Sequence, residues 1–192
     1  MASGPDPIET YEGAAQALIP TFGGVNASQL TSSTPCTEWT VKNLLNHNIN
    51  VQKFLHSTLT GGNMEAGEMY NVDGDLPPEG AEAALKSITD QVISAANGMD
   101  LSTVLGTPFG DMPAGHFMMI PMVDLVVHRW DIASATGQNN AIDSSIAEIC
   151  VGVLSPEALE GGRKMGAFGS EVVIPSTGSI QERLLGSVGR TP

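Results

Sequence analysis

The sequence is short of positive charge. Among its 192 residues, Lys and Arg number 8 and Asp and Glu 21, which gives a formal net charge of −13 at pH 7. Nucleic-acid backbones and anionic lipid surfaces repel such a chain, and no cluster of basic residues offsets that repulsion. The composition therefore excludes nucleic acid and membrane as partners and leaves a small-molecule substrate. A monomer and a homodimer are both compatible with the sequence.

Cysteine and long apolar runs are also scarce. The two cysteines, Cys36 and Cys150, are expected to be reduced thiols, because no secretory signal precedes them. The longest apolar run, residues 117–127, is interrupted by Pro121 and Asp124 and is too short to span a bilayer. We therefore expect a cytoplasmic protein. Aromatic residues make up only 5% of the chain, so the core must be built from aliphatic side chains and Met.

The apolar residues, 41% of the chain, recur mostly at helical spacing, which predicts an all-α fold. We expect one domain over residues 1–192, with a short C-terminal extension from about residue 155 that is mostly loop. A Gly- and Pro-rich segment at 99–113 predicts a short hairpin or an ordered loop, and 60–78 a long surface connection. The predicted helices span 8–22, 41–59, 79–97, 115–136, 144–154 and 179–187.

The predicted helix over 115–136 is apolar almost all round, yet it carries Asp124, His128 and Asp131. Residues four and three apart stack on one helix face, so these side chains form one polar stripe. Burying a carboxylate costs several kcal/mol unless it is paired, hydrogen-bonded or bound to a metal. The stripe therefore predicts a partner, and a divalent metal ion is the sharpest candidate.

His47 lies beside the apolar stripe of the predicted helix over 41–59 and is expected to face inward. With Asp124 and His128 it would give two imidazoles and one carboxylate, a set typical of a catalytic zinc with one open position. Asp131 would then orient a ligand imidazole or act as a base. The alternative is structural, with Asp124 and His128 as a buried pair. His56 and His116 are interpreted as surface or loop residues, with His116 as the spare candidate ligand. Cys36 is interpreted as a small semi-buried residue, and a nucleophile is the alternative.

Two segments carry a family resemblance. The run from Thr34 to His47 (TPCTEWTVKNLLNH) and the run 124–137 (DLVVHRWDIASATG) resemble the mycothiol-dependent maleylpyruvate isomerase-like proteins of the DinB-like superfamily. The chain's last part resembles a single-domain actinobacterial metal-binding subfamily of that group. The resemblance implies a DinB-like four-helix bundle with short extra helices that binds one divalent metal ion through His47, Asp124 and His128.

Two functions from different classes follow from this reading. The first is a metal-dependent enzyme of the thiol-transferase or maleylpyruvate isomerase-like type, which activates water or a low-molecular-weight thiol such as mycothiol at the metal. The second is a non-catalytic module that binds a metal or a small ligand for sensing, sequestration or resistance. Zinc is the expected ion, although two imidazoles and a carboxylate also suit other divalent metals.

Overall fold

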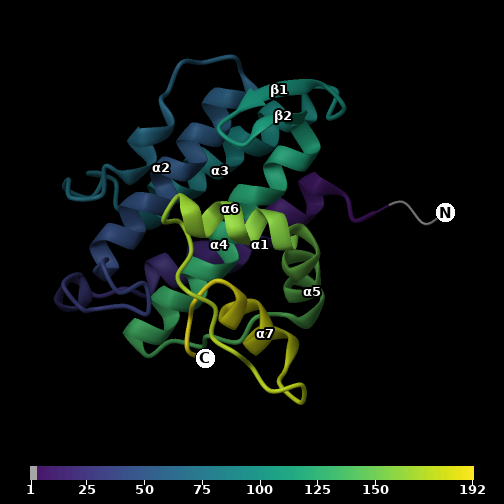
Figure 1. Cartoon of the computed structure of the whole chain (residues 1–192). Helices are drawn as coiled ribbons and strands as arrows, with labels where there is room; N and C mark the ends of the chain where they lie inside the picture. The colour runs from purple at the N-terminus through teal and green to yellow at the C-terminus, as the bar shows by residue number, and fades with distance from the viewer. Residues whose placement is uncertain (1–3) are drawn as a thin grey trace. The chain divides into compact units, whose positions relative to one another are not determined.

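The computed structural model describes residues 4–192, which are mainly helical (Figure 1). The chain divides into two compact units, Met1–Gln138 and Asn139–Pro192. No helix of the described residues has the length and apolar character needed to cross a membrane. The elements are, in order, α1 (Pro7–Gly23), η1 (Ala27–Gln29), α2 (Val41–Leu59), η2 (Ala66–Tyr70), α3 (Ala81–Asn97), β1 (Val104–Thr107), β2 (Gly110–Pro113), α4 (Ala114–Thr136), α5 (Ser144–Val153), α6 (Pro156–Lys164) and α7 (Ile180–Ser187).

The first unit is a four-helix bundle, as the sequence predicts. α1 packs against α3 and α4, and α2 packs against the same two helices, so the four helices enclose one core. α4 is apolar around its circumference and remains helical through Pro121. It is the most deeply buried helix of the bundle, which places its few polar side chains among packed neighbours. The fully buried core side chains include Leu18, Leu44, Leu55, Leu85, Met118, Met122, Leu125 and Ile132.

The helix ends follow from local chemistry. Asp6 caps α1 by accepting hydrogen bonds from the backbone of Ile8 and Glu9. At the start of α2, Thr40 and Asn43 form a reciprocal capping box, because the Asn43 side chain accepts from the Thr40 backbone at 3.0 Å. Asn is not the usual third residue of a capping box, but its side-chain amide oxygen reaches the Thr40 backbone here.

The predicted hairpin is present between α3 and α4. β1 and β2 pair antiparallel, with Val104 opposite Pro113 and Thr107 opposite Gly110. Gly110 has φ 97°, a left-handed conformation that glycine adopts at little cost, and it ends the tight turn. β2 leads directly into α4, so the hairpin fixes where the central helix begins.

In the second unit, α5 packs against α7, and the Gln181 side chain accepts a hydrogen bond from the Ile142 backbone at 2.7 Å. The expectation that 155–178 is loop was wrong for its first part, which forms α6. Ser155 caps this helix through the backbone of Ala158, and Pro156 occupies its first turn. The signal was missed because α6 has few apolar residues and contains two glycines.

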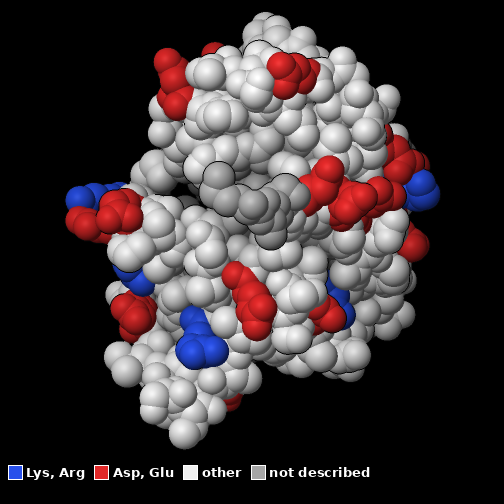
Figure 2. All heavy atoms as spheres, turned by 90° about the vertical axis from the view of Figure 1, so that its right-hand side faces the viewer, with Lys and Arg blue, Asp and Glu red and all other residues white. Residues whose placement is uncertain are grey.

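Acidic side chains are dispersed over the surface. Figure 2 shows Asp and Glu spread across one face, with Lys and Arg fewer among them. Two of the ion pairs, Lys86 with Asp90 and Lys164 with Glu160, are exposed pairs at helical spacing four, which contribute little to stability. This distribution fits the net charge of −13.

Candidate metal centre

Two helices of the bundle bring the predicted ligands together. His47 comes from α2, whereas Asp124 and His128 come from successive turns of α4, and these two helices pack against each other. The side chains of His47 and His128 are buried, and that of Asp124 is 27% exposed. Solvent therefore reaches the cluster beside Asp124.

The three side chains converge on one point. Nε2 of His47 lies 3.5 Å from Oδ2 of Asp124, and Nε2 of His128 lies 3.3 Å from Oδ1 of the same carboxylate. One potential ligand atom from each residue lies within 4.8 Å of the others. Oδ2 of Asp124 is buried and has no hydrogen-bond partner among the described residues. Two nitrogens and an orphaned carboxylate oxygen in this arrangement fit a divalent cation.

A hydrogen bond at Nδ1 orients the imidazole of each histidine. Nδ1 of His47 lies 2.9 Å from the Met69 carbonyl oxygen, which can only accept, so Nδ1 carries the proton. Nδ1 of His128 donates to Oδ2 of Asp131 at 2.8 Å, and Asp131 is fully buried. These contacts leave both Nε2 atoms directed at Asp124. Such outer hydrogen bonds are how proteins fix the orientation and tautomer of ligating histidines.

The cluster strongly perturbs its own ionisation. Burial would raise the pKa of Asp124, but its interactions with His128 and, after it, His47 hold that pKa well below its usual range. Burial would likewise lower the pKa of His128, but attraction to Asp124 and hydrogen bonds to Asp124 and Asp131 raise it to about 9. Without a cation, the protein therefore balances the carboxylates with a proton on His128. A divalent ion would supply that positive charge instead.

Aromatic rings surround the cluster. The ring of Trp39 lies 4.4 Å from that of His47 and 5.9 Å from that of His128, measured between centroids. Tyr70, at the end of η2, lies 5.7 Å from the His47 ring and is 51% exposed. Burial and, after it, the charge of Asp124 raise the pKa of Tyr70. Sequence reasoning did not single out either aromatic residue, although Tyr70 falls in the 60–78 segment.

Cys36 also belongs to this region, and it is half-buried, as its interpretation as a small semi-buried residue predicts. Its Sγ groups with one ligand atom each of His128 and Asp131, all within 4.8 Å of one another. Sequence reasoning missed this placement because the partners lie some 90 residues away on α4, and no base is adjacent in the chain. The available sequence signal was that Cys36 lies in the same segment, residues 34–47, as Trp39 and His47.

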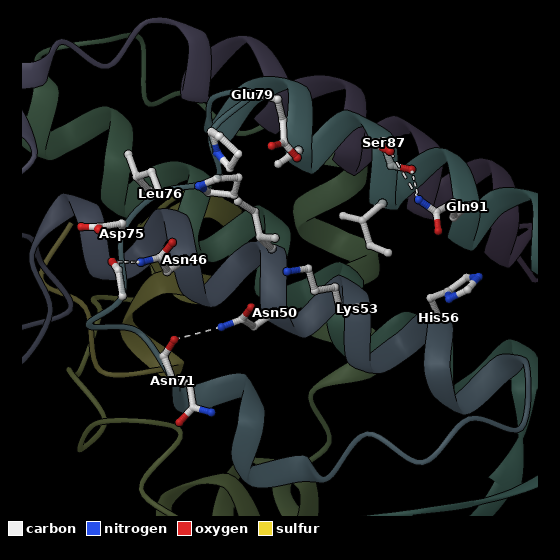
Figure 3. Close-up of a pocket in the computed structure, with 16 residues that line it drawn as sticks. Asn46, Asn50, Lys53, His56, Asn71, Asp75, Leu76, Glu79, Ser87 and Gln91 are labelled. Atoms are coloured by element: carbon white, nitrogen blue, oxygen red, sulfur yellow. Dashed lines mark hydrogen bonds between the residues drawn. The ribbon is translucent and has the colours of Figure 1, made fainter.

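The remaining histidines lie elsewhere. His116 is exposed near the start of α4. His56 lines a separate cavity of about 740 Å³ between α2, α3 and the segment before α3 (Figure 3). Asn46, Asn50 and Lys53 line this cavity with it, and His47 is not among the lining residues. Neither His116 nor His56 joins a potential metal-ligand group within residues 4–192.

Comparison with known proteins identifies the family. The model of the mycothiol maleylpyruvate isomerase N-terminal domain matches residues 12–133, which include all three predicted ligands. The chain belongs to this family. The resemblance of its two histidine-containing segments to maleylpyruvate isomerase-like proteins is thereby confirmed.

One relative matches the chain over almost the full length of both proteins. Over 97% of its length the chain is 28% identical to the uncharacterized protein Rv0738 of Mycobacterium tuberculosis strain H37Rv, of which it covers 98%. Two crystal structures of the mycothiol-dependent maleylpyruvate isomerase, one of them a mutant, share its fold. The mutant has a TM-score of 0.59 at 12% identity and the other 0.55 at 15%, each over 81% of this chain and 71% of that chain. These structural matches confirm the predicted DinB-like fold.

Proposed function

We propose that this protein binds one divalent metal ion, zinc by preference, through His47, Asp124 and His128. The observation that carries the proposal is the convergence of two Nε2 atoms on a carboxylate whose buried Oδ2 has no hydrogen-bond partner in the described residues. A purely structural His–Asp pair would satisfy that oxygen, because leaving it unpaired costs about 1–3 kcal/mol. A cation would satisfy it at once.

We further propose that the site belongs to a metal-dependent enzyme of the thiol-transferase or maleylpyruvate isomerase-like type, with mycothiol or another low-molecular-weight thiol as co-substrate. Family membership supports this class of reaction. A divalent ion bound there would supply Lewis acidity, which lowers the pKa of a water or thiol. Exposure of the Asp124 side leaves room for such a molecule beside the ligands.

The chain's own residues have separable roles in this proposal. Asp131 acts through His128, because it is fully buried and holds the Nδ1 proton that keeps Nε2 available. The Met69 carbonyl does the same for His47. Trp39 and Tyr70 present apolar ring surface beside the exposed edge of the site, where an uncharged part of a small substrate would pack.

Metal analysis of the purified, zinc-loaded protein tests the first half of the proposal. We expect one ion per chain in the wild type, near-complete loss of it in His47→Ala, and full retention in His56→Ala. The last variant is a matched control, because His56 lies on the same helix but lines the separate cavity. Full zinc content in His47→Ala would refute the ligand assignment.

Thiol-dependent turnover tests the second half. The zinc-loaded wild type is incubated with mycothiol and a panel of small electrophiles. Loss of the free thiol, which reports S-transfer, and thiol-dependent conversion of the electrophile, which also reports isomerisation, are measured against His47→Ala. We expect at least one of the two only in the wild type. If the ion binds stoichiometrically and no electrophile is turned over, the enzyme assignment is wrong and the protein is a binding module.

A further inference from the structure

The region around α4 holds two potential ligand groups, and they share one residue. His47, Asp124 and His128 form the first, and Cys36, His128 and Asp131 form the second. The first group meets His128 at Nε2, which is 3.3 Å from Asp124. On the other side of the ring, Nδ1 lies 2.8 Å from Asp131. The imidazole of His128 therefore lies between two sets of potential metal ligands.

A rigid turn delivers Cys36 to this position. The hydroxyl of Thr34, which is buried, accepts from the Cys36 backbone N–H at 3.1 Å and lies 2.8 Å from the carbonyl oxygen of Trp39. The Trp39 N–H in turn donates to the Cys36 carbonyl at 2.8 Å. These bonds close the turn over 34–39 and hold Cys36 and Trp39 in place together. The hydrogen-bonded turn therefore fixes the position of the Cys36 backbone beside α4.

The two groups require opposite tautomers of His128. A neutral imidazole has one lone pair, which serves as a metal ligand, while its other nitrogen carries a proton. When Nδ1 donates to Asp131, the lone pair on Nε2 faces the first group. When the proton is on Nε2, Nε2 can donate a hydrogen bond to Oδ1 of Asp124, 3.3 Å away. The lone pair on Nδ1 then faces the second group. One carboxylate is available to orient the ring in each case.

We propose that Cys36, His128 and Asp131 form a second metal site, specific for a strongly thiophilic divalent ion such as cadmium, and that its occupancy excludes occupancy of the His47 site. A thiolate is a soft ligand, so the second site favours softer ions than two imidazoles and a carboxylate do. Binding releases two protons to solvent, one from the Cys36 thiol and one from Nδ1 of protonated His128, whose Nε2 keeps its proton. The chain then binds one ion at a time, and the softness of that ion determines which of the two sites it occupies.

Cadmium titration tests the proposal, because a cadmium–thiolate bond gives a ligand-to-metal charge-transfer band in the ultraviolet. We expect the wild type to develop this band and to saturate at one equivalent of cadmium. Cys36→Ser and Cys36→Ala should both lose the band while keeping the wild-type circular dichroism. Cys150→Ala is the matched control and should keep it, since Cys150 is fully buried and burial raises the pKa of its thiol to about 12.

A His47→Ala variant separates this inference from the proposed function. We expect it to lose the zinc of the first site but to retain the cadmium–thiolate band. Absence of the band in the wild type, its persistence in both Cys36 variants, or its loss in His47→Ala would overturn the second site. Saturation at two equivalents would overturn the mutual exclusion. If His47→Ala kept its zinc, the proposed function would fail at the first site, whatever the cadmium result.

Discussion

Without a bound metal ion, the free energy of unfolding of this protein should fall as pH rises. The pKa of His128 determines the size of this decrease. Its pKa is raised from 6.5 to about 9 in the folded protein. Because the folded pKa is the higher one, protonated His128 stabilises the fold fully below about pH 6.5, and this contribution is lost as pH rises through about 9. At 1.36 kcal/mol per pKa unit, the loss is about 3 kcal/mol.

Thermal unfolding of the chelator-treated protein, followed by circular dichroism between about pH 6 and pH 10, measures this loss. For a chain of this length, a change of about 3 kcal/mol corresponds to a decrease in Tm of roughly 6–12 °C. The zinc-loaded protein should not show the decrease. Ligation needs the neutral imidazole, so apparent metal affinity rises with pH over the same range. The two Tm curves should therefore diverge above about pH 7.

A His128→Gln variant is the control for this prediction. It keeps a polar side chain beside Asp124 and Asp131 but cannot be protonated, so its metal-free Tm should stay level across the range. A level curve for the metal-free wild type would refute the derived coupling of His128 to the two carboxylates. A decrease in His128→Gln as steep as in the wild type would assign the effect to other groups.

Two further predictions concern the support of the site and the end of α4. Asp131→Asn can still accept from Nδ1 of His128 but lacks the charge, so zinc affinity measured by competition with a chelator should fall about 10–100-fold, with near-native circular dichroism. Gly137, the left-handed residue after α4 (φ 72°), has open space at its Cβ position. Gly137→Ala should therefore cost about 1 kcal/mol in urea unfolding from backbone strain alone, and Gly137→Asn less, because Asn tolerates that conformation.

Local sequence signals predicted most of the bundle. The apolar spacing of α1, α2, α3 and α4 follows from the helical repeat, and the turn-rich segment at 99–113 contains the hairpin. α6 was missed because a short polar helix leaves little periodicity to detect. Its cap at Ser155 and the following Pro156 were the available evidence. Periodicity reports burial, so elements that bury little are the ones it overlooks.

The candidate site was predictable where its residues share a helix. Asp124, His128 and Asp131 are three and four apart, so their stacking on one face follows from helix geometry alone. The pairing of His47 with them across a second helix was predicted from its position beside the apolar stripe of that helix, and the family resemblance of its segment supported the pairing. The Met69 carbonyl behind His47 could not be predicted, because a backbone atom on a distant 3₁₀ turn leaves no residue-type signal.

The sequence by itself determined the fold class, the acidic surface and a polar stripe buried in an apolar helix that needs a partner. Only the tertiary structure decided which donors meet that stripe. Within residues 4–192 it left Oδ2 of Asp124 without a hydrogen-bond partner, and it grouped Cys36 with His128 and Asp131. Helical periodicity fixes neighbours within about one turn, whereas contacts across some 90 residues depend on how the turn over 34–39 packs against α4.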